Sequence, residues 1–428
     1  MNPISVALKG KGLFKLARRA VSIVKSYGVT SGHKMDRALR QFTAILNRFE
    51  CSATFPITAV ALGRNPQMIK KYQGQGIEFA IHGYRHVDHC QFSQAEQLAQ
   101  LALAKRLFDS VGIPVQGFRG PYLHANSDTL VALRHQRLAY DSSQGLIWEV
   151  LDGCETAAYR HVLSFYGALS ANDYPSLPSL KDNLLRIPYN LPDDEALVHR
   201  LSLETTDRMN ALWLAVLHRS YGLGELFTLG LHPERIFICQ EPLIAVLSEA
   251  RQLDPGVWIA RLDEIATWWR ARNEAEVEIT DTTDGKLRVI VMGPSGTTVL
   301  ARGVQVDAPT EPWADGYREV EATTFTLHAP LRPFIGLSPA TSPELGDFLQ
   351  QQGHIVEISE ESHRYSYYFN QPEFTTEDKR PVLAQVEAPD RPLVRLGRWP
   401  DGARSALAIT GDIDALTIWD YGLRLFGR

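Results

Sequence analysis

Apolar and polar positions change their spacing along the 428-residue chain. Between residues 35 and 275, segments with an apolar residue every three or four positions alternate with short apolar runs, as in helices that alternate with buried strands. The expected helices are 35–49, 66–74, 93–112, 127–135, 207–220, 241–253 and 260–273, and the expected strands are 52–58, 77–83, 138–143, 184–190 and 226–233. This alternation predicts an α/β fold built on a parallel sheet or barrel.

Residues 275–400 have a different pattern, in which short stretches with every second position apolar are separated by Gly, Pro and Asp. Only one helix is predicted there, at 342–352, so this part reads as a small antiparallel, β-sandwich-like domain. Residues 405–410 (SALAIT) are then apolar and lead into two acids, which predicts one more buried parallel strand. We therefore expect a main domain at 1–274, an inserted β domain at 275–400, and a return to the main domain at 401–428.

Composition narrows the class of protein. The chain is 44% hydrophobic and 22% charged, as in globular proteins, and its net charge of −5 does not favour a nucleic-acid partner. The longest apolar runs fall short of the roughly 18 residues that a membrane span needs. The four cysteines form no CxxC pair and are expected to be reduced thiols, which favours a cytoplasmic location.

The first 28 residues combine apolar positions at helical spacing with interspersed Lys and Arg. They lack an uninterrupted apolar stretch and a small-residue cleavage site, so we do not expect a secretory signal. We expect a helix packed on the main domain with a solvated basic face. The alternative is a helix that lies on a membrane surface.

Candidate chemistry begins with His82 and His86 in IHGYRH, at the end of the strand predicted at 77–83. On a helical turn, residues four apart share a face and could hold one cation between them. Such a pair also occurs among ordinary polar histidines, but barrels carry their sites at the carboxyl ends of strands. A third ligand is needed, and Asp412 and Asp414 end the predicted strand at 405–411. One of these carboxylates could bind the metal while the other acts as a base.

Two further segments carry suitable side chains. Arg119 in GFRGPY is a permanent cation that can orient a carboxylate, and the backbone N–H of Tyr122 could stabilise an oxyanion. His232 in LGLHP follows an apolar strand and could act as a general acid near neutral pH. Taken alone, GFRGPY fits a surface arginine with a core tyrosine equally well, and for His232 a capping or surface role is the more common one.

Taken together, these motifs resemble the polysaccharide deacetylase family, also called the NodB homology or carbohydrate esterase 4 family. HGYRH is similar to the family's metal motif, RGPY to its arginine motif, and LGLHP to its final L-x-H motif. YDSS, with Asp141, resembles the segment whose acid pairs with the motif arginine. The resemblance covers about residues 35–273 and implies a distorted (β/α) barrel.

The family's first motif, a strand ending in T-F-D-D, has no counterpart before His82, whereas ALAITGDID at 406–414 is similar to it. We therefore expect a circularly permuted barrel, in which residues 405–411 supply the missing strand and the β domain is an insertion. By position, Asp412 would be the catalytic base and Asp414 the metal ligand. The D-x-D spacing in place of D-D leaves this division open. Arg119 and Asp141 would orient the base, and His232 would be the acid.

The resemblance implies a metal-dependent hydrolase that removes the N-acetyl group of an N-acetylated sugar or polysaccharide. Zinc is the first expectation for two histidines and one aspartate, with nickel, cobalt and iron as alternatives. Two other functions fit the same residues. One is an amidohydrolase that acts on a small non-sugar amide or ureide, and the other is a non-catalytic carbohydrate-binding or assembly protein.

Overall fold

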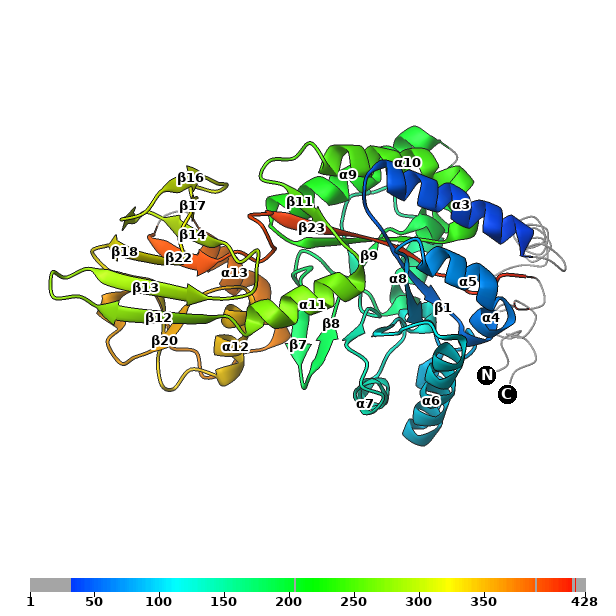
Figure 1. Ribbon diagram of the computed structural model, residues 1–428, viewed down its shortest axis with the longest axis horizontal. Coiled ribbons are helices and arrows are strands. Elements are labelled where there is room, and N and C mark those ends of the chain that lie inside the picture. Colours follow the sequence, from blue (N-terminus) through cyan, green and yellow to red (C-terminus); the bar gives the residue numbers. More distant parts are fainter. Residues whose placement is uncertain (1–31, 204, 389–390, 418–419, 421–428) are drawn as a thin grey trace.

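The computed structural model describes residues 32–203, 205–388, 391–417 and 420. The helix predicted within the first 28 residues lies outside these ranges. None of the described helices has the length and apolar character needed to cross a membrane. The described chain has two parts, a large α/β part and a smaller part formed by residues 276–396 (Figure 1).

One long, curled sheet organises the α/β part. In the described residues it has twelve strands, eleven of them in the order β6-β5-β9-β10-β23-β1-β2-β3-β4-β8-β7, while β11 also pairs with β23. All neighbours are parallel except β7 and β8. The bounds, in chain order, are β1 Thr54–Ile57, β2 Glu78–Ile81, β3 Gly117–Phe118, β4 Tyr140–Asp141, β5 Gly145–Ile147, β6 Leu169–Ser170, β7 Ser179–Lys181, β8 Leu184–Arg186, β9 Tyr189–Leu191, β10 Leu226–Leu231, β11 Val257–Ile259 and β23 Ser405–Gly411. The two end strands, β6 and β7, do not pair with each other, so the sheet forms a half-barrel.

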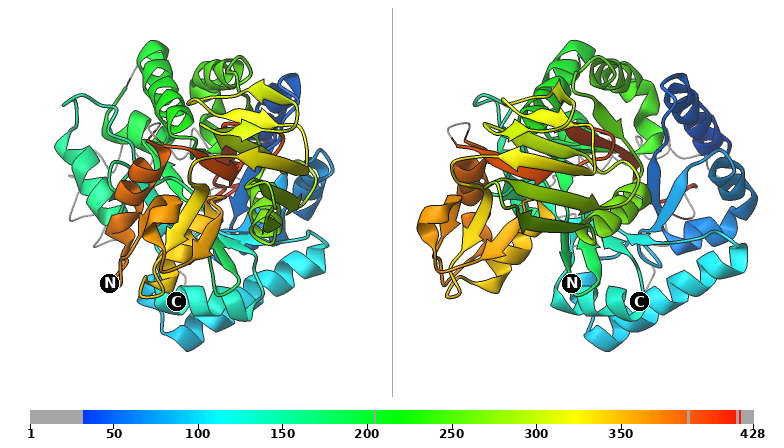
Figure 2. Two further views of the ribbon diagram at one scale, coloured as in Figure 1. Left: turned by 90° about the vertical axis from the view of Figure 1, so that its left-hand side faces the viewer. Right: turned by 60° about the vertical axis from the view of Figure 1, so that its left-hand side comes forward.

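Helices surround the outer side of this sheet (Figure 2). They are α3 His33–Arg48, α4 Ala59–Arg64, α5 Pro66–Gln73, α6 Gln94–Val111, α7 Ser127–His135, α8 Ala157–Tyr166, α9 Thr206–Gly222, α10 Ile236–Ala250 and α11 Leu262–Asn273. Local sequence sets their ends: α6, for example, begins with a reciprocal capping box between Ser93 and Glu96 and stops at Gly112, whose φ of 77° is left-handed. Helices α4 and α8 were not predicted.

The last described strand, β23, lies in the middle of the sheet, between β10 and β1. Every residue of β23 is buried. A parallel strand that is covered on both faces must be apolar along its length, which is why SALAIT forms this element. The prediction that residues 405–411 join the main sheet is confirmed by its pairing with β10, β1 and β11.

The smaller part is more mixed than predicted. Its antiparallel sheets have the orders β12-β13-β18-β15 and β16-β17-β14-β22, as the alternating pattern indicated, but its third sheet, β20-β19-β21, is parallel. A second helix, α13, was also not predicted. The bounds are β12 Glu276–Asp281, β13 Leu287–Met292, β14 Val299–Arg302, β15 Gln305–Val306, β16 Thr310–Pro312, β17 Arg318–Val320, β18 Thr324–His328, β19 Arg332–Leu337, α12 Pro343–Gln351, β20 Val356–Ile358, β21 Tyr365–Phe369, α13 Lys379–Glu387 and β22 Leu393–Leu396. Of the parallel strands, β19 and β21 are almost entirely buried, whereas β20 is only partly buried.

The smaller part packs against the amino-terminal ends of the main strands. Leu226, which begins β10, and Ala406, near the start of β23, share one apolar cluster with Ile335 and Leu349 of the smaller part. Trp269 of α11 and Trp399, in the connection to β23, pack in the same cluster with ring centroids 5.3 Å apart. The carboxyl ends of the strands lie at the opposite end of the sheet, so the smaller part does not cover them.

Candidate active site

The side chains singled out in the sequence gather at the carboxyl end of the main sheet. His82 follows β2, Arg119 follows β3, His232 follows β10, and Asp412 follows β23. Because β10, β23, β1, β2 and β3 are consecutive parallel neighbours, their carboxyl ends lie along one edge. Residues that are more than 300 positions apart in sequence are thus brought to one place.

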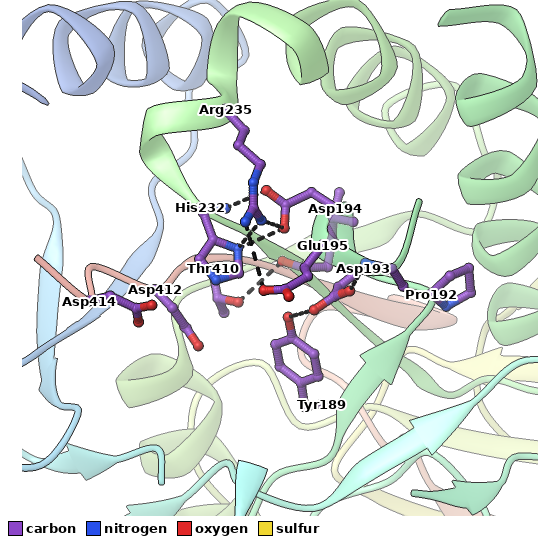
Figure 3. Close-up of polar contacts among 12 residues, drawn as sticks. Tyr189, Pro192, Asp193, Asp194, Glu195, His232, Arg235, Thr410, Asp412 and Asp414 are labelled. Carbon is purple, nitrogen blue, oxygen red and sulfur yellow. Dashed lines mark hydrogen bonds and ion pairs between the residues drawn. The ribbon is translucent and has the colours of Figure 1, made fainter. Parts of the chain in front are cut away.

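Asp412 and Ile413 continue the course of β23, and Asp414 lies at a bend directly after them. The backbone N–H of Asp412 donates to Leu231 O at 2.9 Å, on the β10 side, and that of Ile413 donates to Pro56 O at 2.7 Å, on the β1 side. Residues two apart in extended chain point the same way. The D-x-D spacing therefore sends both carboxylates to one side, and Figure 3 shows Asp412 beside Asp414.

The histidine pair lies on an irregular loop, so the prediction of a helical turn is wrong. Gly83 turns the chain off β2 with a φ of 79°, and a Cβ there would lie 2.7 Å from the backbone oxygen of Arg85. Nδ1 of His82 lies 2.8 Å from the carbonyl oxygen of Arg119. Since a carbonyl can only accept, Nδ1 carries the proton and Nε2 presents its lone pair.

His82, His86 and Asp414 fit a divalent metal ion. Asp414 Oδ1 lies 3.3 Å from His82 Nε2 and 3.2 Å from His86 Nε2, and the three candidate ligand atoms lie within 4.8 Å of one another. Atoms bound to a tetrahedral zinc ion at about 2.0–2.1 Å are themselves about 3.3 Å apart. The other acid nearby, Asp88, points elsewhere, because it pairs with His124 Nδ1 at 3.0 Å.

Arg119 is fully buried and joins four strands. Its Nη1 donates to Asp412 Oδ1 at 2.6 Å and to Thr410 Oγ1 at 3.0 Å, while Nε and Nη2 donate to the backbone oxygen and the hydroxyl of Ser142. The guanidinium carbon lies 4.6 Å from the centre of the Tyr189 ring. With its partners placed on several sides, Arg119 holds the Asp412 carboxylate in one position.

Asp141 does not join Arg119 and Asp412, so this part of the prediction is wrong. Its carboxylate accepts a hydrogen bond from Ser143 Oγ and lies 3.4 Å from Arg186 Nε on β8, the strand on the far side of β4. Successive residues of a strand point to opposite sides, and here it is Ser142 that faces Arg119. Asp141 acts on the arginine turn through Ser143, which accepts from the Gly120 N–H at 2.8 Å.

His232 has a partner, Asp194, that the sequence motifs did not indicate. Asp194 Oδ1 lies 2.7 Å from His232 Nδ1, Asp194 Oδ2 accepts from the His232 backbone N–H, and Arg235 Nη1 donates to Asp194 (Figure 3). Burial opposes the imidazolium, but the Asp194 carboxylate outweighs it and raises the pKa of His232 to about 10. The available signal was the acid pair in LPDD, directly after the strand predicted at 184–190.

Tyr122 stands at the edge of this group. Its backbone lies in the left-handed region with a φ of 62°, which is uncommon for a residue with a side chain. Its ring centre lies 4.6 Å from that of His86, and the side chain remains partly exposed. The turn after β3 thus brings both Arg119 and Tyr122 to the histidine pair.

Comparison with known proteins gives the following matches. Among solved structures, a putative polysaccharide deacetylase from Mycobacterium smegmatis is 21% identical, with 54% of this chain and 76% of that chain covered and a TM-score of 0.41. A probable polysaccharide deacetylase from Pseudomonas aeruginosa PAO1 is 21% identical over 54% and 73% of the chains, with a TM-score of 0.43. The Puue allantoinase is 19% identical over 55% and 72%, with a TM-score of 0.44.

No curated protein sequence matches the chain. Residues 28–140, which include both histidines, Arg119 and Tyr122, match the family model described as polysaccharide deacetylase. This part of the chain therefore resembles the polysaccharide deacetylase family.

Proposed function

We propose that the protein is a metal-dependent deacetylase that hydrolyses the N-acetyl group of an N-acetylated sugar or polysaccharide. The family match supports a hydrolase of amide bonds. The observation that carries the proposal is the position of Asp414, whose Oδ1 lies 3.3 and 3.2 Å from the two imidazole nitrogens. Asp412 lies beside it, held by a buried arginine.

His82, His86 and Asp414 would hold the metal ion, for which zinc is the first choice. When bound, the ion supplies Lewis-acid activation of a water molecule and of the acyl oxygen. The residues of the chain contribute the rest of the chemistry. The carbonyl of Arg119 accepts from Nδ1 of His82, which leaves Nε2 as the nitrogen that would bind the ion.

Asp412 is the proposed general base. Arg119 binds only one of its carboxylate oxygens in the contacts described, Oδ1, and thereby directs the carboxylate to the side on which Asp414 lies. The base takes a proton from the attacking water. The backbone N–H of Tyr122 is the proposed donor to the oxygen that gains charge as the water adds.

His232 is the proposed general acid. Asp194 accepts a hydrogen bond from Nδ1–H, which leaves the Nε2 proton for transfer to the departing nitrogen. With a pKa raised to about 10 by Asp194 against the effect of burial, the ring is protonated at neutral pH. The products are acetate and a free amino sugar.

We also infer that the chain is a permuted version of the family's barrel. The support is the position of β23, which comes last among the described strands but lies between β10 and β1 at the centre of the sheet. The family match ends at residue 140 and does not reach this strand.

The test combines metal analysis with acetate release from N-acetylated oligosaccharides. Protein that has been stripped of metal should lose activity and recover it on addition of zinc. Asp414→Asn should lose both metal and activity, whereas the matched control Asp88→Asn, in the same loop as the histidines, should retain both. Allantoin is the contrasting substrate. Hydrolysis of allantoin without acetate release from any oligosaccharide would replace the sugar with a ureide, and full activity without metal would refute the proposal.

A further inference from the structure

Four arginines gather where the smaller part meets the main sheet, at the opposite end of the sheet from His82 and His86. Arg272 lies in the last turn of α11, Arg302 ends β14, Arg395 lies in β22, and Arg398 lies in the connection from β22 to β23. His354 and Glu387 lie among them, and we call the six residues the arginine cluster. All four arginines and His354 are buried, with exposed fractions of 3–6%.

One carboxylate faces this group. Glu387 Oε1 lies 3.0 Å from Arg398 Nη2, 3.7 Å from Arg395 Nε and 3.8 Å from His354 Nε2. Burial works against ionisation of Glu387, but Arg395 and Arg398 outweigh it and lower its pKa to about 2. Among the described residues, Glu387 is the carboxylate that Arg395 and Arg398 contact within 4 Å.

Two helix ends supply part of the remaining compensation. Arg302 donates to the backbone oxygens of Val386 and Glu387 at the end of α13, and Arg272 donates to the backbone oxygen of Gln351 at the end of α12. The carboxyl end of a helix carries roughly half a negative charge. Glu387 and the two helix ends together offset roughly half of the positive charge. Glu225 and Asp315 also act on Arg398 and Arg395, but they are already paired with Arg380 and Arg404.

The guanidinium groups also have donors left over. Nε and Nη1 of Arg272, Nε and Nη1 of Arg395, and Nε of Arg398 have no hydrogen-bond partner among the described residues. The same holds for both ring nitrogens of His354. Burial, Arg398 and Arg395 lower the pKa of Arg272 to about 9. Buried donors and buried charges without partners are costly, and native proteins satisfy them with water or an ion.

We propose that the arginine cluster binds a small tetrahedral oxyanion of the phosphate or sulfate type. The planar guanidinium donors suit the oxygens of such an ion. The negative charge of the ion balances the positive charge that Glu387 and the helix ends leave uncompensated. The surrounding residues are buried, which favours a whole free ion over the phosphate group of a large molecule. The ion would tie α11 and the connection to β23, through Arg272 and Arg398, to the smaller part.

Equilibrium dialysis of the full chain with labelled inorganic phosphate is the direct test. We expect about one phosphate per chain, displaced by sulfate and not by chloride at equal ionic strength. The thermal midpoint should also rise in phosphate relative to chloride at that ionic strength, because an ion that binds only the folded state stabilises it. Glycerol phosphate should bind more weakly. Equal affinity for glycerol phosphate would contradict an enclosed free ion, and the absence of bound phosphate in the wild type would overturn the site.

Arg395→Gln tests the residues. It removes one charge and two unpartnered donors, so phosphate binding should weaken by at least about tenfold, the value of one charge-assisted hydrogen bond. The control is Arg404→Gln at the same junction, since Arg404 is already paired with Asp315 and with the backbone oxygens of Tyr221 and Gly222. This control should bind phosphate as the wild type does. Unchanged phosphate binding by Arg395→Gln would refute the assignment, and if this variant does not fold, dialysis of the wild type decides alone.

Discussion

Replacing Asp412 with asparagine separates the proposed base from the proposed metal ligand. The substitution keeps the size of the side chain and one oxygen that can accept from Arg119, but it removes the negative charge. The Arg119–Asp412 contact is 2.6 Å long and its arginine is fully buried. Asp414, with both imidazole contacts, is left untouched.

Two magnitudes follow for this variant. Loss of a general base lowers kcat by about 10²–10⁴-fold. Arg119 keeps its hydrogen bonds to Thr410 and Ser142, so the free energy of unfolding should fall by about 1.5–3 kcal/mol, the value of a charged hydrogen bond. This is less than the roughly 3–5 kcal/mol expected when the partner of a buried charge is removed entirely.

The assay is metal content, acetate release and urea unfolding measured on the same preparation. Asp412→Asn should retain about one metal ion per chain, and Asp414→Asn should lose it. The reasoning is refuted if Asp412→Asn loses the metal while Asp414→Asn retains it, because the two residues would then have exchanged roles.

Three further outcomes are expected. His232→Gln should lower kcat by about 10²–10⁴-fold without a change in metal content. Substrates with a more acidic leaving amine should recover part of the rate. A normal rate on all substrates would remove His232 from the mechanism. Gly83→Ala should weaken zinc binding in a competition titration, because its Cβ would lie 2.7 Å from the backbone oxygen of Arg85. The control is Gly153→Ala, which has the same φ of 79° but open space around it, and it should leave the zinc affinity unchanged. Burial and the nearby Asp263 raise the pKa of Glu78 from 4.5 to about 8, so Glu78 ionises at a lower pH in the unfolded chain than in the folded one. The free energy of unfolding should therefore fall as the pH rises from 4.5 to 8. Urea titrations of Glu78→Gln should show a smaller fall, and an unchanged fall would show that Glu78 is not its source.

Periodicity was a good guide to the main elements. The helices predicted at 66–74, 93–112 and 127–135 match α5, α6 and α7 within one residue at each end. Their apolar stripes and end signals are local, so a single sequence contains them. The parallel unit of β19–β21 was missed, because its strands are short and a short apolar run does not show whether its neighbours are parallel or antiparallel.

The candidate site was predicted in part. The motifs indicated His82, His86, Arg119 and His232, and the family's missing acid led to residues 412 and 414. Asp194 was missed and Asp141 was misplaced, because which acid faces which cation depends on neighbouring strands. Asp194 reaches His232 from beyond β9, while Asp141 faces β8, and neither relation leaves a pattern within one segment.

The sequence by itself determined the types of element, the strand-end positions of the polar residues and the need for a carboxylate beside two histidines. These depend on spacing within a segment and on the chemistry of each side chain. Only the tertiary structure decided that β23 lies between β10 and β1, which carries Asp414 from the far end of the chain to His82 and His86. The physical reason is that parallel pairing buries an apolar strand wherever the sheet has room for it. The site is therefore assembled by strand order in space and not by order in the chain.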